Sequence, residues 1–231
     1  MFKSIQIQTT TKCTRECAWC PNDKLELGRM TLKDYEVIME NLLGINYEGR
    51  IHPYLMAEPF CDGRIFYLIQ MTRRFFPNNI IFLYTNGDKL TEETVRMAKE
   101  AGLDGMAVSV YDSKNEWLPR AACVYPDFMH FMLREDIAHQ FFNRGGHVSV
   151  ACTHPVVTCE FLWKKMYINY KGQAVLCCAD YESEVVMGDA LEDSLLDIWE
   201  GKKYFNYRER HAAKETKELA LCKTCNRLIG G

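Results

Sequence analysis

The distribution of apolar and polar residues over the first half of the chain predicts strands that alternate with helices. Strands are expected at 5–7, 51–56, 80–84 and 106–111, and helices at 31–43, 65–76 and 91–102. Apolar residues recur at helical spacing in the helical segments, and Thr31 and Thr91 are suitable N-cap residues. This alternation favours a parallel sheet built from right-handed crossover units. We therefore expect an α/β fold with functional side chains at the carboxyl ends of the strands.

The regular alternation ends after residue 111. Only about nine residues separate Tyr111 from the next apolar run at 121–125, which is too few for a complete crossover helix. The fold is therefore expected to be an abbreviated, partial (β/α) barrel. Residues 136–142 are compatible with either a short helix or a last strand, and 143–146 contain the glycines of a turn.

The composition changes near residue 150, so two domains are expected, at 1–150 and 151–231. In the second, residues 166–176 alternate around a central glycine and predict a β-hairpin. One or two helices are expected over 195–207, with a break at Gly201. The C-terminal domain is thus expected to be a small β-hairpin plus helix unit.

The overall composition is that of a soluble globular protein, with 48% hydrophobic and 26% charged residues in 231 positions. A formal net charge of -3 gives no reason to expect a nucleic-acid partner. The sequence shows no apolar run long enough to span a bilayer and no signal peptide, so a cytoplasmic location without a membrane partner is expected. In a reducing compartment, clusters among the 11 cysteines indicate metal binding rather than disulfides.

Three cysteines follow the first expected strand at the spacing CxxxCxxC: Cys13, Cys17 and Cys20. Three thiolates on one loop suit iron or zinc, and both metals normally take four ligands, so one position is left open. Trp19 directly precedes the last cysteine and offers an aromatic face for a flat ring. By spacing alone, half of a zinc site is the alternative.

A second set of cysteines lies in the C-terminal part, at Cys159, Cys177, Cys222 and Cys225. Four thiolates can ligate a 4Fe-4S cluster or a tetrahedral zinc ion, so their spacing leaves both metals open. The remaining cysteines are expected to be small core residues rather than ligands: Cys61, Cys123, Cys152 and Cys178. Of these, Cys178 is an alternative ligand because it neighbours Cys177.

The first motif resembles the signature of radical S-adenosylmethionine (radical SAM) enzymes, CxxxCx(aromatic)C. The resemblance implies a partial (β/α) barrel of radical SAM type and a 4Fe-4S cluster held by the three thiolates, whose open iron binds S-adenosylmethionine (SAM). It also implies an oxidoreductase in which SAM is cleaved reductively to a 5'-deoxyadenosyl radical that abstracts hydrogen from the substrate. A reductant such as flavodoxin or ferredoxin would supply the electron.

Segments at the ends of three expected strands match SAM-binding motifs of this family. The likeness assigns to SAM the residues Trp19, Ala57, Glu58, Pro59, Thr85, Asn86, Gly87 and Ser109. Ala57 stands where the family's GGEP motif has a glycine, so that match is weaker. Without the likeness, the same segments would be a strand end, a turn and a buried serine.

The second cysteine set resembles the SPASM and twitch domains that follow the barrel in many radical SAM enzymes. Cys159, Gly172 and Cys177 match their opening pattern, and the pair at Cys222 and Cys225 completes the twitch form. The resemblance implies one auxiliary 4Fe-4S cluster with four cysteine ligands, giving two clusters in all. With no iron open to substrate, the auxiliary cluster would accept an electron, which makes the net reaction an oxidation.

Within this family, the likeness covers nearly the whole chain for twitch enzymes of aminoglycoside biosynthesis that oxidise a secondary alcohol to a ketone. It implies a small, hydroxylated substrate resembling a sugar or cyclitol, with Arg144 placed to orient or help deprotonate a hydroxyl. Those enzymes carry an aromatic residue and an acid where this chain has Cys178 and Ala179. Loss of the acid removes a partner for a substrate hydroxyl or ammonium, which argues against the same substrate.

Two other functions are compatible with the motifs. One is a radical SAM peptide maturase that forms a crosslink in a ribosomal peptide precursor. Only 12 residues precede Cys13, so the sequence given has no peptide-recognition domain there, and a small substrate is favoured. The other is a metal-binding module without radical chemistry, which requires all the strand-end motifs to be accidental.

Overall fold

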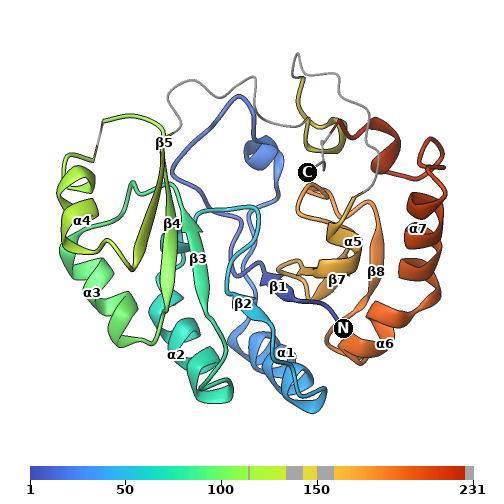
Figure 1. Cartoon of the computed structure of the whole chain (residues 1–231), viewed down its shortest axis with the longest axis horizontal. Coiled ribbons are helices and arrows are strands. Elements are labelled where there is room, and N and C mark those ends of the chain that lie inside the picture. The colour runs from blue at the N-terminus through green and yellow to red at the C-terminus, as the bar shows by residue number, and fades with distance from the viewer. Residues whose placement is uncertain (114, 134–142, 150–158, 227–231) are drawn as a thin grey trace.

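The computed structural model describes residues 1–113, 115–133, 143–149 and 159–226 (Figure 1). Its strands are β1 (Ser4–Ile7), β2 (Arg50–His52), β3 (Phe82–Thr85), β4 (Gly105–Val110), β5 (Met129–Leu133), β6 (Lys165–Ile168), β7 (Gln173–Val175) and β8 (Val186–Asp189). Its α-helices are α1 (Leu32–Gly44), α2 (Ile65–Phe75), α3 (Glu92–Glu100), α4 (Leu118–Val124), α5 (Phe161–Lys164), α6 (Leu195–Glu200) and α7 (Lys202–Ala212).

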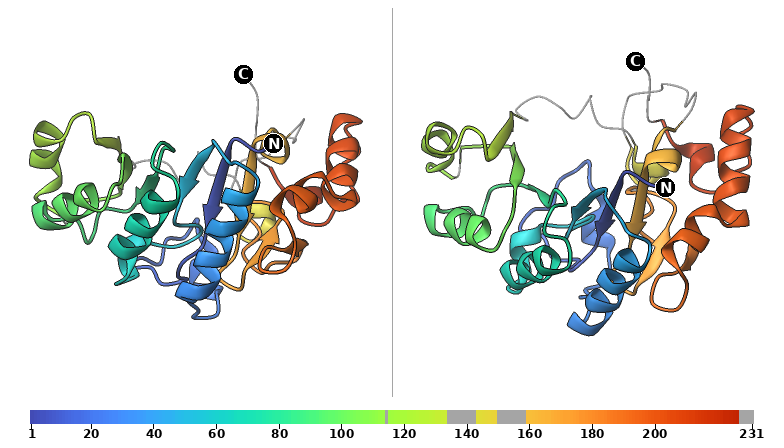
Figure 2. Two further views of the ribbon diagram at one scale, coloured as in Figure 1. Left: turned by 90° about the horizontal axis from the view of Figure 1, so that it is seen from below. Right: turned by 60° about the horizontal axis from the view of Figure 1, so that its bottom comes forward.

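The strands form an open arc of parallel and antiparallel pairs. They hydrogen-bond in the orders β2-β1-β6-β7-β8 and β3-β4-β5, and a parallel bridge between Ile51 and Ile81 joins the two groups. The pairs from β1 to β6 are parallel, whereas β7 and β8 are antiparallel additions at one end. Figure 2 shows the arc from two further directions. This is the expected partial barrel.

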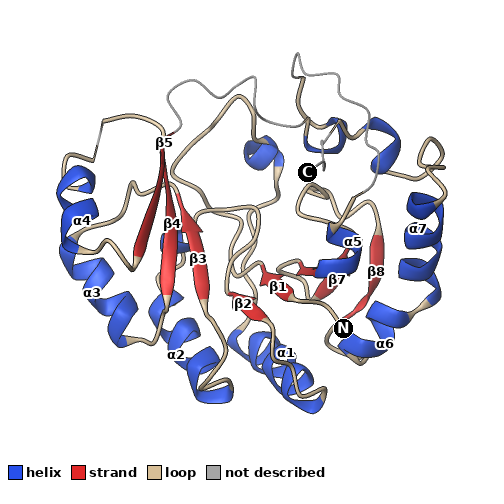
Figure 3. Ribbon diagram, viewed as in Figure 1, coloured by secondary structure: helices blue, strands red, loops and turns tan. Residues whose placement is uncertain are grey.

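Helices α1 to α4 lie along the outer side of the arc, as Figure 3 shows. The N-caps expected at their starts are present, since the Thr31 hydroxyl accepts a hydrogen bond from Asp34 N at 3.0 Å. Thr91 forms a reciprocal capping box with Thr94 at the start of α3. The helices are therefore fixed at their N-terminal ends, which lie on the same side as the carboxyl ends of the strands that precede them.

The first strand joins the two expected domains. β1 pairs with β2 on one side and with β6 on the other, so a strand of the C-terminal part continues the sheet of the barrel. One hydrophobic core accordingly contains Ile5 of β1, Ile38 of α1 and Trp199 of α6. Residues 1–7 are thus the centre of the molecule rather than its edge.

Most expected elements are found within two residues of their expected bounds. Gly201 separates α6 from α7, and β6 and β7 form the expected hairpin. The second strand is shorter than expected, because β2 ends at His52 and Met56 has a φ of 44°, which an extended strand does not allow. The segment 136–142 lies outside the described residues.

The sequence did not predict the structure of the apolar run at 121–125. This apolar run belongs to the crossover helix α4, and the strand that follows is β5, which pairs in parallel with β4. The helix has only seven residues, so the crossover is shorter than the one the spacing argument required. The strand β8 was not expected from the sequence either.

The described residues contain no helix that is both long and apolar enough to cross a membrane.

We expect replacement of Ile5 by Ala to destabilise the whole molecule. Ile5 is fully buried and its register partners are Ile51 and Met166, so the substitution leaves a cavity between the two halves. The free energy of unfolding should fall by about 2 to 5 kcal/mol, measured by urea titration of the reduced protein. The control is Leu43→Ala on α1, where the side chain is 51% exposed. Similar losses in both variants would contradict a central role for β1.

Candidate active site

The first cysteine loop leaves the carboxyl end of β1 and is closed at its base by Thr11. The Thr11 hydroxyl donates to Glu26 O at 2.9 Å and accepts from Gly28 N at 2.8 Å, while Asn22 Nδ2 donates to Thr11 O at 3.1 Å. A Cβ atom on Gly28 would lie 2.1 Å from the Tyr170 ring, so only glycine fits there. The loop is therefore fixed at both ends.

Arg15, between the first two cysteines, ties the loop to the ends of β3 and β4. Its Nε donates to Asp88 Oδ2 at 2.9 Å and its Nη1 to Asp112 Oδ2 at 3.0 Å. Thr14 Oγ1 also donates to Asp88, at 2.7 Å, and the guanidinium lies 5.1 Å from the centre of the Tyr111 ring. Burial alone would lower the Arg15 pKa, but the hydrogen bonds that Arg15 donates to Asp112 and Asp88 raise it, so the ion pair stays charged.

Glu58 ties the end of β2 to the end of β3. Its carboxylate is 2% exposed and accepts hydrogen bonds from Thr85 Oγ1 at 2.7 Å, Asn86 N at 2.7 Å and Phe60 N at 3.2 Å. Burial raises the pKa of Glu58 to about 7, although the three donors favour the charged form. The carboxylate is thus engaged by protein donors.

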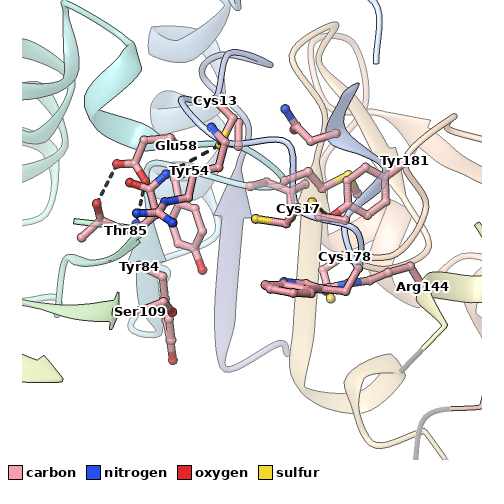
Figure 4. Close-up of a pocket in the computed structure, with 18 of the residues that line it drawn as sticks. Cys13, Cys17, Tyr54, Glu58, Tyr84, Thr85, Ser109, Arg144, Cys178 and Tyr181 are labelled. Carbon is pink, nitrogen blue, oxygen red and sulfur yellow. Dashed lines mark hydrogen bonds between the residues drawn. The ribbon is translucent and has the colours of Figure 1, made fainter. Parts of the chain in front are cut away.

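A cavity of 290 Å³ lies between the cysteine loop, the ends of the first four strands and the C-terminal part (Figure 4). The residues expected to bind metal, SAM or substrate that line it are Cys13, Cys17, Trp19, Cys20, Ala57, Glu58, Thr85, Asn86, Ser109 and Arg144. In Figure 4, Thr85 and Ser109 lie across the cavity from Tyr181 and Arg144. The strand-end motifs and the first cysteine set are therefore brought together.

Two of the residues expected to bind SAM do not line the cavity. Pro59 is buried at the start of the turn Pro59–Cys61. Gly87 has a φ of 77°, and a Cβ atom on it would lie 2.9 Å from Val108 Cγ1. Both residues shape the loops that carry their neighbours.

Hydrogen-bond donors lie beside two of the three thiols of the first set. Cys13 Sγ accepts from Arg15 N at 3.5 Å and from Asn86 Nδ2 at 3.7 Å, and the Tyr181 hydroxyl lies 3.4 Å from Cys20 Sγ. Donors of this kind stabilise ligating thiolates. Burial and the neighbouring Cys20 and Cys13 raise the pKa of Cys17 to about 11, so a bound cation is needed to hold the three thiolates together. The residues present fit a metal cluster.

The second cysteine set is also assembled by the fold. Burial raises the pKa of Cys177 well above its usual value, with further contributions from Cys178, Cys159 and Cys222. Burial, Cys159 and Cys225 raise the pKa of Cys222 to about 12. All four thiols are therefore close neighbours, and every cysteine of the described residues is free of disulfides.

Among the described residues, no three Cys, His, Asp or Glu side chains converge as the ligands of a single metal ion do. In a 4Fe-4S cluster each thiolate binds a different iron, so the ligands surround a larger volume than those of one zinc ion.

The turn that carries Arg144 is held by the segment that contains the last cysteine pair. Asn143 N donates to Asn226 Oδ1 at 2.6 Å and Asn226 N donates to Asn143 Oδ1 at 3.1 Å. Arg144 has a φ of 51°, and a Cβ atom on the adjacent Gly145 would lie 2.5 Å from Leu221 Cδ1. The segment that follows Leu221 therefore determines where Arg144 points.

Sequence reasoning missed several residues of the site. The expectation that the single cysteines lie in the core was wrong for Cys178, which lines the cavity, and for Cys123, which is exposed, and Cys61 is only partly buried. Four tyrosines also line the cavity: Tyr54, Tyr84, Tyr111 and Tyr181. Spacing carries no signal for them, because each becomes a cavity residue only through the arrangement of four separate loops. Cys152 lies outside the described residues.

Comparison with protein families gives two adjacent matches. The model of the Radical SAM superfamily matches residues 7–154. The model of SPASM, an iron-sulfur cluster-binding domain, matches residues 159–226. The second match contains all four cysteines of the C-terminal set.

Individual relatives agree with the family matches. The S-adenosyl-L-methionine-dependent 2-deoxy-scyllo-inosamine dehydrogenase of Niallia circulans is 26% identical, over 98% of this chain and 93% of that protein. The crystal structure of BtrN in complex with AdoMet and 2-DOIA superposes with a TM-score of 0.89 at 25% identity, over 99% and 94% of the two chains. That of anSMEcpe with bound AdoMet, at 14% identity and a TM-score of 0.64 over 97% and 88%, shares the fold alone. These likenesses confirm the expected radical SAM fold with an auxiliary iron-sulfur domain.

The raised pKa of Glu58 predicts a pH-dependent contribution to stability. An ordinary glutamate loses its proton near pH 4.5 in the unfolded chain, whereas buried Glu58 keeps it to about pH 7. The stabilisation is therefore complete below pH 4.5 and is lost as the pH rises through about 7. Between pH 4.5 and 8, the free energy of unfolding of the wild type should fall by on the order of 3 kcal/mol relative to that of Glu58→Gln. Urea titration of metal-free, reduced protein measures this change.

The control substitution is Glu92→Gln, at an exposed position in the first turn of α3. The difference between the wild type and this variant should stay constant over the same pH range. If the difference in free energy of unfolding between the wild type and Glu58→Gln also stayed constant with pH, burial would not raise the pKa of Glu58.

Proposed function

This chain belongs to the Radical SAM superfamily, and we propose that it is a dehydrogenase that oxidises a secondary alcohol in a small hydroxylated molecule. The observation that carries the proposal is the single cavity shared by the cysteine loop, the strand-end motifs and Arg144. The similarity to a dehydrogenase of known substrate over 98% of this chain supports the reaction class.

We propose that the chain holds SAM and two 4Fe-4S clusters. The ligands of the SAM-binding cluster are Cys13, Cys17 and Cys20, and those of the auxiliary cluster are Cys159, Cys177, Cys222 and Cys225. SAM would contact the side chains or backbone of Trp19, Ala57, Glu58, Thr85, Asn86 and Ser109. Pro59 and Gly87 act through the loop conformation, because neither lines the cavity.

When bound, SAM and the reduced cluster supply the 5'-deoxyadenosyl radical, and the protein holds the substrate beside it and excludes water. Oxidation of the alcohol removes one hydrogen atom from carbon, one proton from the hydroxyl and one electron from the remaining radical. The hydrogen atom goes to the deoxyadenosyl carbon and the proton to solvent. Cys159, Cys177, Cys222 and Cys225 would hold the auxiliary cluster through four thiolates, so it would have no iron open to substrate and could accept the electron.

Arg144 is proposed to bind the hydroxyl that is oxidised. Its pKa is raised, since Tyr181 and Cys178 offset the lowering effect of its burial, so it remains a guanidinium and acts as a donor rather than a base. A guanidinium aimed at the hydroxyl oxygen orients it and stabilises the negative charge that develops as its proton leaves.

The lining of the cavity argues for a neutral substrate. Glu58 is the only carboxylate among the described lining residues, and its oxygens are engaged by β3. Asp180 accepts hydrogen bonds from Glu184 N at 2.7 Å and Val185 N at 3.0 Å, and Ala179 is buried. Among the described residues on the C-terminal side of the cavity, no acid is therefore available to bind an ammonium group of a substrate. We propose that the substrate is a cyclitol or sugar that carries a hydroxyl in place of that ammonium.

A small molecule and an electron donor are the proposed partners. Cys13 is exposed, so the edge of its cluster would lie near the surface, where a reductant such as flavodoxin or ferredoxin can transfer an electron.

Anaerobic reconstitution tests the cluster assignment. The wild type should hold about eight irons per chain and form 5'-deoxyadenosine from SAM and dithionite. Replacement of Cys159, Cys177, Cys222 and Cys225 by Ala should leave about four irons. Replacement of Cys13, Cys17 and Cys20 should abolish 5'-deoxyadenosine while the auxiliary cluster is retained. Bound zinc at the second set would contradict the proposed electron acceptor.

Substitution of Arg144 tests the substrate assignment. Arg144→Gln should lower ketone formation from a cyclitol about 100-fold, because one donor to the developing charge is lost. It should leave SAM cleavage without substrate within about twofold of the wild type, and the exposed Arg96→Gln should change neither rate. The substrates compared are scyllo-inositol, which is neutral, and 2-deoxy-scyllo-inosamine, which carries an ammonium. Oxidation of neither, with crosslinking of a precursor peptide, would overturn the proposal in favour of a peptide maturase.

A further inference from the structure

A fully buried histidine lies against the second cysteine set. His211, in the last turn of α7, has 0% exposure, and its Nε2 lies 3.4 Å from Cys222 Sγ. The catalytic cavity described above does not include it. Its position therefore needs a reason other than substrate or SAM binding.

The direction of this hydrogen bond follows from the chemistry of the two atoms. A ligating thiolate has lone pairs but no proton, so Nε2 must carry the hydrogen and donate it. His211 Nδ1 is buried and has no hydrogen-bond partner among the described residues. The ring thus has one polar contact, and that contact is the sulfur.

The surroundings strengthen this contact. α7 turns Tyr204, Tyr207 and His211 toward the interior, and the chain returns to Cys222 within 11 residues. The Tyr207 hydroxyl donates to Ala220 O at 3.5 Å, which holds the returning segment against the helix. The His211 ring is fully buried. In a poorly polar environment a hydrogen bond to a charged sulfur is stronger than in water.

We infer that His211 is a positioning residue that donates an N–H···S hydrogen bond to Cys222 and raises the reduction potential of the auxiliary cluster. The inference rests on the proposed function, in which Cys222 ligates that cluster. A donor to a ligating sulfur stabilises the reduced, more negative form of a cluster. His211 thereby favours transfer of the electron from the substrate radical to the cluster.

The first cluster has a comparable contact, which provides an internal control. The Tyr181 hydroxyl lies 3.4 Å from Cys20 Sγ, so Tyr181→Phe removes a donor from a ligand of the SAM-binding set only. The two substitutions should therefore act on different clusters in the same protein.

The test is a potentiometric titration of reconstituted protein followed by electron paramagnetic resonance. His211→Phe keeps a ring of similar volume but removes the donor. It should lower the reduction potential of the auxiliary cluster by about 59 mV, which for one electron weakens electron acceptance about tenfold. The SAM-binding cluster should be unchanged. Tyr181→Phe should give the reverse pattern, and His211→Gln, which retains an N–H donor, should lie closer to the wild type.

The outcomes separate this inference from the proposed function. A wild type with only about four irons per chain would refute the two-cluster function itself. Two clusters with an unchanged auxiliary potential in His211→Phe would overturn the role of His211 alone. If His211→Phe loses the auxiliary cluster, His211→Gln decides the question. A cluster retained in His211→Gln with a potential near that of the wild type supports the hydrogen bond. A potential low enough to weaken electron acceptance about tenfold in His211→Gln overturns it.

Discussion

The placement of β1 between β2 and β6 is the constraint on which the site depends. Because β1 pairs in parallel with both neighbours, the loop at its carboxyl end must emerge between the barrel and the C-terminal part. A loop with three cysteines and little apolar surface cannot hold its own conformation. It is held instead from both sides, by Asp88 and Asp112 through Arg15, and by Tyr181 at Cys20. The central strand therefore aligns the loop, and the polar contacts then fix it.

These polar contacts connect loops that are distant in sequence. Arg15 with its two aspartates, and Glu58 with Thr85 and Asn86, join the ends of β1 to β4 into one unit. Each group is wholly or partly buried, so removing one partner leaves the other without compensation, which costs more than the loss of a surface contact. The carboxyl ends of the strands are thus rigid although they consist of loops. Such rigidity suits a site in which a radical must meet one substrate hydrogen.

The sequence was sufficient where a local pattern determines the structure. Thr31 and Thr91 are N-caps because a hydroxyl at that position satisfies free backbone donors, and the CxxxCxxC spacing keeps three thiols on one loop. It was insufficient where the outcome depends on partners elsewhere. The motif identified Glu58 as a site residue, but not that Thr85 and Asn86 would engage its carboxylate. Arg15 carries no recognisable signal, since its role exists only once Asp88 and Asp112 lie beside it. Similarly, α4 is too short to have been recognised as a crossover.

The C-terminal part serves the catalytic cavity as well as its own cysteines. It contributes Cys178 and Tyr181 to the lining, and Asn226 holds the turn that presents Arg144. Cys225 directly precedes Asn226, so whatever fixes the last cysteine pair also fixes Arg144, the residue proposed to bind the substrate hydroxyl. A bound auxiliary cluster would therefore have two effects at once, because it would order the residue that orients the alcohol and accept the electron that the oxidised alcohol releases. In the proposed reaction, substrate orientation and electron removal would depend on the same few residues.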